Sequence, residues 1–283
     1  MFSNIPKIIF IVPYRNRVND LTHFRVYMKY ILEDILTTDY EIYFSYQNDE
    51  RAFNRGATKN IGFLAMREKY PDHYRDITFV FNDIDILPCK KNMLNYTTEI
   101  GIVKHFYGFN FALGGIFSII GSDFERIKGF PNFWGWGWED NVINNRCLEN
   151  DIKIDRTCFY PISHPDFIQT SMQRNKLLSE QRPDINDCAD DNIDTLKNVK
   201  YSIVPLNLYD NENDNENDNE KYLNNQLSDC WCHNSAIIKI DNFNTIRQYT
   251  PNRFYIQDLV KHRKIVNDRS KIVAHKLRWS LSR

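Results

Sequence analysis

Two adjacent carboxylates follow three tryptophans that are separated by single glycines in residues 129–141. Glycine lets the backbone turn sharply and approach a ligand closely. An indole face offers a flat surface to the apolar side of a sugar ring. A carboxylate beside such a platform, Glu139 or Asp140, is placed to take a proton from a bound hydroxyl. A single tryptophan here would favour a structural turn, but the combination with acidic residues upstream favours a sugar-binding site.

A second acidic motif, Asp83-Ile84-Asp85, follows the apolar run 77–81. Residues two apart on a strand lie on the same side, so both carboxylates can face one ligand. Paired carboxylates are hard oxygen donors that suit Mg²⁺ or Mn²⁺, and these metals usually bridge to phosphates. Most isolated Asp-x-Asp triplets serve as helix caps or turns. At the end of a buried strand, however, the motif indicates a nucleotide site.

The elements that must position these motifs alternate between strand and helix. Continuous or alternating apolar runs predict strands at 8–12, 40–46 and 77–81, and helical spacing predicts helices at 18–36 and about 57–70. This order predicts an α/β fold with a largely parallel sheet covered on both faces. Ligands of such sheets bind beyond the carboxyl ends of the strands. Pro13-Tyr14-Arg15 and Asp83-Ile84-Asp85 are therefore expected on one rim.

Composition restricts the class of protein. The 283 residues are 42% hydrophobic and carry a net charge of −1, which is typical of a globular chain and gives no overall field for nucleic acid. No apolar run is long enough to cross a bilayer, and a strand within the first ten residues leaves no room for a signal peptide. Six cysteines in a chain of this length do not indicate a disulfide scaffold. We therefore expect a soluble, cytoplasmic protein with no nucleic-acid partner.

The C-terminal part differs in composition. Residues 210–221 form an acidic Asp/Asn/Glu segment, interpreted as a solvated loop between a domain at 1–209 and an extension at 222–283. The extension carries eleven Lys/Arg against four Asp/Glu, with helical patterns near 254–266 and 270–281. Its positive charge is compatible with binding to an acidic partner, although the pattern favours a solvated helix docked on the main domain. Cys230-x-Cys232-His233 has no second pair at ligand spacing, and we assign no zinc site to it.

Four blocks of sequence resemble the β-1,4-galactosyltransferases, which are inverting sugar transferases of GT-A fold. The resemblance runs from about Lys7 to His164. It rests on residues 12–17 (VPYRNR), 53–62 (FNRG and NIG), 79–88 (FVFNDIDILP), and 114–115 (GG) followed by 129–140 (GFPNFWGWGWED). The order and compatible spacing of the blocks make the resemblance specific. It implies a mixed, Rossmann-like sheet flanked by helices, to which the sequence adds a small helical extension.

The resemblance also implies residue roles. The nucleotide-sugar site would comprise Pro13, Tyr14, Arg15, Arg17, Phe53, Arg55, Asp83 and Gly115. Asp85 and His164 would bind Mn²⁺ or Mg²⁺, and Trp136 and Trp138 would contact the acceptor sugar. Asp140 would be the general base, with Glu139 holding a sugar. A deprotonated acceptor hydroxyl would then displace UDP from a UDP-sugar in a single step.

This chain departs from the family pattern at three points. Gly137-Trp138-Glu139-Asp140-Asn141 stands where relatives commonly have Gly-Gly-Glu-Asp-Asp, so an indole and an amide are introduced. Residues 159–162 offer neither the Met nor the His that would be the third metal ligand. Ala112 stands where galactose-specific members carry a tyrosine that crowds the sugar C2 substituent. Three hypotheses follow: a galactosyltransferase-like enzyme, a transferase using UDP-GlcNAc or another nucleotide sugar, and a sugar-nucleotide-binding protein that has lost turnover.

Overall fold

The structure is a computed structural model that describes residues 5–170, 176–179, 188, 190–206, 234–251 and 254–257. Its helices are α1 (Val18–Ile31), α2 (Arg55–Lys69), α3 (Gly121–Arg126) and α4 (Glu139–Glu149), with a 3₁₀ turn at Ile193–Thr195. Its strands are β1 (Ile8–Tyr14), β2 (Tyr40–Gln47), β3 (Thr78–Asn82), β4 (Ile86–Pro88), β5 (Ile102–Gly108), β6 (Ile116–Ile120), β7 (Lys153–Asp155), β8 (Tyr160–Pro161), β9 (Phe167–Gln169), β10 (Lys176–Ser179), β11 (Lys197–Pro205), β12 (Ser235–Asn244) and β13 (Phe254–Gln257).

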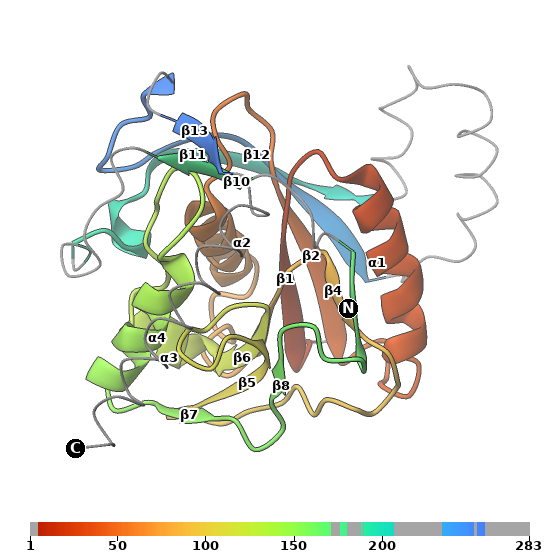
Figure 1. Ribbon diagram of the computed structural model, residues 1–283. Coiled ribbons are helices and arrows are strands. Elements are labelled where there is room, and N and C mark those ends of the chain that lie inside the picture. The colour runs from red at the N-terminus through yellow and green to blue at the C-terminus, as the bar shows by residue number, and fades with distance from the viewer. Residues whose placement is uncertain are drawn as a thin grey trace, which may run out of the picture.

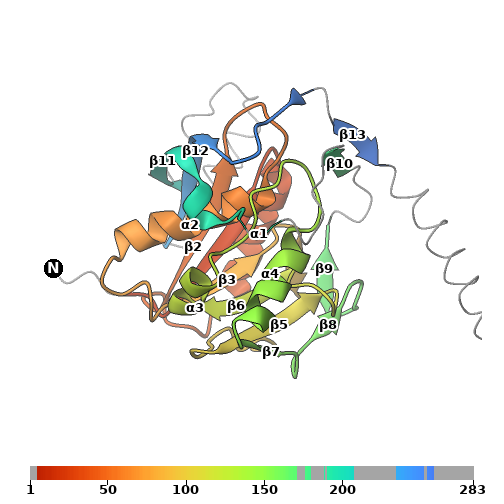
Figure 2. The ribbon, with the colours of Figure 1, turned by 90° about the vertical axis from the view of Figure 1, so that its left-hand side faces the viewer.

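One large mixed sheet organises the described part of the chain (Figure 1). Its strand order is β11-β12-β2-β1-β3-β6-β5-β7, with β8 paired to β5. The pairs β12·β2, β2·β1 and β1·β3 are parallel, whereas β6 is antiparallel to both β3 and β5. Helix α1 covers one face, and α2, α3 and α4 lie on the other (Figures 1 and 2). The predicted α/β class is confirmed, and the sheet is mixed, as the resemblance implied.

The structure confirms the three strands and two helices predicted upstream of residue 82. Their apolar residues pack into the cores on the two faces of the sheet. Along β1, Ile9 and Ile11 pack in the core on the α2 side, whereas Ile8, Phe10 and Val12 pack on the α1 side. A strand buried on both faces is apolar throughout, as the sequence of β1 shows. Helix α1 ends at Ile31 rather than at 36. The amide of Glu33 donates to the carbonyl of Tyr30, three residues earlier, instead of continuing the α-helical pattern of four.

The predicted C-terminal extension is wrong in two places. Ser235–Asn244 form β12, which pairs in parallel with β2 and therefore belongs to the main sheet. Phe254–Gln257 form β13, which pairs with β10, so no helix begins at 254. In β12, Ile237, Ile238, Ile240 and Phe243 are fully buried, and this burial outweighs any local preference. The acidic segment 210–221, Cys230, Cys232, His233 and the rest of both predicted helices lie outside the described residues.

The rim predicted from the sequence is present. Strands β1 and β3 are parallel neighbours in register, with Ile11 opposite Phe81, so the residues that follow them meet at one edge of the sheet. None of the helices described here combines the length and the apolar character that a membrane span requires.

Candidate active site

The amino end of α2 places Arg55 at the centre of the site. Asn54 caps the helix by accepting a hydrogen bond from the amide of Ala57 (2.9 Å), as expected for asparagine at this position. Gly56, the second residue of α2, allows close contact with the Trp-rich segment, because a Cβ there would lie 1.9 Å from the carbonyl oxygen of Pro131. This contact brings the start of α2 against the segment that leads to Glu139.

Arg55 joins the two acidic motifs. Its guanidinium donates to both oxygens of Asp83, at 2.7 and 2.6 Å, and to Oε1 of Glu139 at 2.7 Å. Asp140 lies 3.8 Å from the same guanidinium. One turn further along α2, the ammonium of Lys59 lies 3.6 Å from both Asp83 and Asp140. The motifs identified from the sequence therefore form one cluster, in which two cations face three carboxylates.

The excess of negative charge separates the pKa values of the carboxyl groups. Burial disfavours the charged form of Asp83, but Arg55 and Lys59 outweigh it and hold its pKa well below the usual range. At Asp140 burial wins over Lys59 and Arg55, and with the repulsion of Glu139 and Asp83 it raises the pKa to about 6. Groups with pKa values driven apart in this way are candidates for acid–base chemistry.

Asp140 is the second residue of a helix and lies against a loop that contains two glycines. It is in the first turn of α4, where a negative charge is favourable. The cap residue, Trp138, has a left-handed backbone (φ 68°), a costly conformation for a bulky residue that tends to occur at functional sites. On the other side, the amide of Leu113 donates to the carbonyl of Asp140 (2.8 Å). Gly114 leaves room for the carboxylate, since a Cβ there would lie 2.5 Å from its Oδ2.

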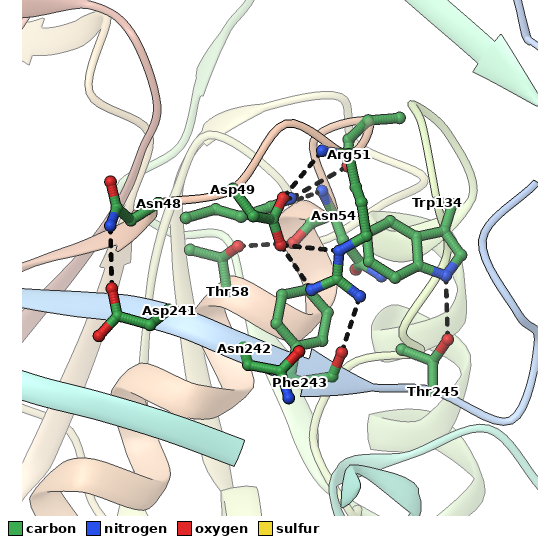
Figure 3. Close-up of polar contacts among 12 residues, drawn as sticks. Asn48, Asp49, Arg51, Asn54, Thr58, Trp134, Asp241, Asn242, Phe243 and Thr245 are labelled. Carbon is green, nitrogen blue, oxygen red and sulfur yellow. Dashed lines mark hydrogen bonds and ion pairs between the residues drawn. The ribbon is translucent and has the colours of Figure 1, made fainter. Parts of the chain in front are cut away.

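The C-terminal part of the chain anchors the Trp-rich segment (Figure 3). The indole of Trp134 stacks on Phe243 of β12 at 5.2 Å and donates to Thr245 at 3.0 Å. The guanidinium of Arg51 lies 4.6 Å from both rings and donates to the carbonyl of Phe243. Asp49 accepts from the same guanidinium. The loop before Arg55 and the loop before Glu139 are thus both attached to β12.

The nucleotide-site residues predicted around β1 lie near the loop that precedes Arg55. Pro13 and Tyr14 are buried at the end of β1, where Tyr14 packs on Tyr46 at 5.1 Å. Arg15 donates to the carbonyls of Asp49 and Arg51. The carbonyl of Gly115 accepts from the amide of Asp83 (2.9 Å). Phe53 and Trp136 are partly exposed, and Trp138 is 36% exposed. The structure brings these residues to one edge of the sheet, and their binding roles stay predictions.

The predicted metal ligands show a partial fit. Burial and the charge of Asp83 raise the pKa of Asp85, against the effect of Arg17, whose guanidinium lies 3.2 Å away. A cation would relieve this repulsion. His164 contacts Tyr160 and Asp166, and neither a hydrogen bond nor an ion pair joins it to Asp85. Its segment does pair with the strand after Asp85, through Gln169 opposite Ile86. In the described ranges no group of three His, Cys, Asp or Glu side chains could hold a metal. The two donors fit Mn²⁺ or Mg²⁺ in kind, and within the described ranges the remaining ligands would be water or phosphate.

Two features of the site escaped sequence analysis. The first is Lys59, which is almost completely buried next to Asp83. Its spacing of four residues from Arg55 places both cations on one face of α2, and this spacing is the sequence signal for a second cation in the site. Phe109 and Phe111 stack at 5.2 Å with more than half of each side chain exposed, on the loop that leads to Gly114. An exposed aromatic pair suits an apolar surface or the apolar face of a sugar.

The fold matches the GT-A fold of solved galactosyltransferase catalytic domains. Two solved structures of Drosophila beta1,4galactosyltransferase 7, one with xylobiose and a mutant with manganese, UDP-Gal and xylobiose, match at a TM-score of 0.56. They are 19% and 18% identical in sequence, and each match covers 84% of this chain and 94% of the other.

Sequence comparison identifies the family. The model of the N-terminal region of glycosyl transferase group 7 matches residues 3–98, and that of the N-terminal domain of galactosyltransferase matches residues 98–169. Beta-1,4-galactosyltransferase 1 of Mus musculus is 32% identical over 159 residues, 53% of this chain and 39% of the relative. Beta-1,4-galactosyltransferase 2 of Cricetulus griseus is 30% identical over 203 residues, 68% of this chain and 51% of the relative. The chain belongs to the β-1,4-galactosyltransferase family, and it spans between about two fifths and one half of the length of these curated relatives.

Proposed function

We propose that this protein is a metal-dependent inverting glycosyltransferase. It transfers a hexose or N-acetylhexosamine from a UDP-sugar to a hydroxyl group of a carbohydrate acceptor. The observation that carries the proposal is the carboxylate of Asp140, which is close to two cations and has a pKa raised to about 6. A general base works best when its pKa lies near the working pH. Family membership and the Drosophila relative's manganese, UDP-Gal and xylobiose support the same reaction.

The residues divide the work as follows. Asp140 takes the proton of the acceptor hydroxyl, and Glu139, fixed by Arg55 and by the amide of Gly137, holds a sugar. Trp136 and Trp138 contact the acceptor ring. The residues after β1 and the 53–55 loop bind the uridine and diphosphate. Asp85 and His164 would hold Mn²⁺ or Mg²⁺, which supplies charge neutralisation for the departing diphosphate.

The donor sugar is proposed from Ala112, which stands where galactose-specific relatives carry a tyrosine. Ala112 is buried immediately before Leu113, whose amide bonds to Asp140. Alanine lacks the bulk with which that tyrosine would crowd the sugar C2 substituent, so UDP-GalNAc and UDP-GlcNAc are candidate donors besides UDP-Gal. Pocket shape alone discriminates modestly, by about 1–3 kcal/mol.

A second candidate is a sugar-nucleotide-binding protein without turnover, since the described residues supply only two predicted metal ligands. A UDP-release screen across nucleotide sugars, with Mn²⁺, with Mg²⁺ and with EDTA, separates the two. The proposal expects release from one donor that depends on metal and increases with a saccharide acceptor. Tight binding of UDP-sugars with no release under any of these conditions would favour the binding protein.

A further inference from the structure

Lys59 is a buried lysine that sits between donor-side and acceptor-side residues. Its side chain is 2% exposed, and its ammonium lies 3.6 Å from Asp83 and from Asp140. The ring of Phe130 covers it, 4.7 Å from ammonium to ring centroid. Lysine is almost never fully buried unless it is paired. A buried ammonium does not contribute to solubility. The two neighbouring carboxylates explain why a lysine is present here.

The distances between Lys59 and Asp140 are informative. Oδ1 of Asp140 is buried and takes part in no hydrogen bond, while its nearest cation is the ammonium at 3.6 Å. Arg55 is 3.8 Å from Oδ2, also beyond hydrogen-bond length. The positive charges of Lys59 and Arg55 therefore stabilise the carboxylate of Asp140 from beyond hydrogen-bond length, and Oδ1 accepts no hydrogen bond. A base needs both properties, because a donated hydrogen bond would occupy the lone pair that must take the proton.

We propose that Lys59 is a positioning residue for the transfer reaction, one that keeps Asp140 in its ionised form and ties it to Asp83. The inference rests on the proposed function of Asp140 as general base. The charged groups around Asp140 are Arg55 and Lys59 on α2, Glu139 on α4 and Asp83 after β3. Removing one cation leaves Arg55 alone against three carboxylates, so the proton should bind Asp140 more tightly.

The first test is the pH dependence of UDP release by Lys59→Met, which removes the charge and keeps the length of the side chain. A neighbouring cation lowers a carboxyl pKa by about 1–3 units, so the acid limb of the kcat profile should move up by that amount. Turnover should fall on the order of tenfold at pH 7 and recover towards pH 9. The matched control is Lys69→Met, on the same helix but paired with Glu41 at 3.0 Å, and its profile should equal that of the wild type.

A purely structural role predicts a different result. Loss of packing would lower kcat by the same factor at every pH, so a Lys59→Met profile parallel to the wild type overturns the proposal. Lys59→Arg keeps the charge and should keep the acid limb in place, even if its bulk lowers kcat. If Lys59→Met does not fold, an acid limb that moves upward in Lys59→Arg overturns the proposal instead.

A second test does not require turnover. Unfolding of the wild type, Lys59→Met, Asp140→Asn and the double variant at pH 7 gives a double-mutant cycle. Direct coupling predicts non-additivity of at least about twofold in the unfolding equilibrium constant. Additive effects overturn the inference. Clear coupling with full turnover in Asp140→Asn would instead overturn Asp140 as the base, so the two failures can be told apart.

Discussion

Replacing Asp140 by asparagine should make the protein more stable at neutral pH while it abolishes most of its activity. The amide keeps the shape of the side chain but cannot ionise. Turnover should fall by at least about 10²-fold, the low end for general-base catalysis, while UDP-sugar binding is retained. The gain in stability follows from the charge cluster, where removal of one carboxylate leaves two cations facing two carboxylates.

The magnitude follows from the pKa of Asp140, which is raised from 3.8 to about 6. Two units correspond to about 3 kcal/mol. Because 24% of the side chain is exposed and screened by solvent, we expect about 2 kcal/mol. Below pH 3.8 the folded and unfolded forms are both protonated, and the group costs nothing. Between 3.8 and 6 only the unfolded chain ionises, so wild-type stability decreases, and above pH 6 the cost is constant.

The assay is denaturant or thermal unfolding of the wild type and Asp140→Asn from pH 4 to pH 8. The difference should be close to zero at pH 4 and reach its full value above pH 6, or about 4–8 °C in Tm for a domain of this size. Exposed Asp72, changed to Asn, is the control and should show no such trend. A variant that is less stable than the wild type at pH 7, or a difference equal at both ends, would refute the electrostatic argument.

Three further predictions concern the loop beside the base, the donor and the connection between β11 and β12. Gly114→Ala should lower kcat by up to about 10²-fold with UDP-sugar affinity unchanged, since its Cβ would lie 2.5 Å from Asp140 Oδ2; normal kcat would contradict the contact. Ala112→Tyr should reduce kcat/KM for UDP-GalNAc and UDP-GlcNAc relative to UDP-Gal, and a strict preference for UDP-Gal in both forms would count against Ala112 as the residue that admits a larger C2 substituent. Deleting residues 211–220 should change the free energy of unfolding by only about 0.4 kcal/mol through loop closure, as measured by urea unfolding. A large loss of stability would show that the segment packs.

The N-terminal half of the fold could be predicted from sequence because its signals are local. Ile8–Val12 is apolar throughout, since neighbours bury both of its faces, and the run alone identifies a buried strand. Strand β12 is different, because its partner on β2 lies almost two hundred residues earlier and no local pattern names that partner. Phe254–Gln257 show why a short periodic pattern is ambiguous, since the same apolar residues serve a strand.

The candidate site divides in the same way. Asp83, Glu139 and Asp140 could be identified because they follow a strand and a glycine-rich turn and match a family pattern. Arg55 is expected from the resemblance in the nucleotide-sugar site, a role that stays a prediction, but nothing in the sequence indicates that it binds both Asp83 and Glu139. For Lys59, the spacing of four residues from Arg55 indicates a shared face of α2, but its burial depends on the Phe130 segment that covers it and has no local sequence signal.

The position of β12 has a consequence for how the chain folds during its synthesis. Strand β2 ends at Gln47, but the strand that covers its outer edge begins only at Ser235. At about 5–20 residues per second, that edge waits roughly 10–40 s for its partner. Until then the nascent chain presents an unpaired, largely apolar strand edge, which is a template for association with other chains. Association through this edge would compete with folding throughout the interval, so we expect the yield of native protein to depend on chaperone supply as well as on the stability of the finished fold.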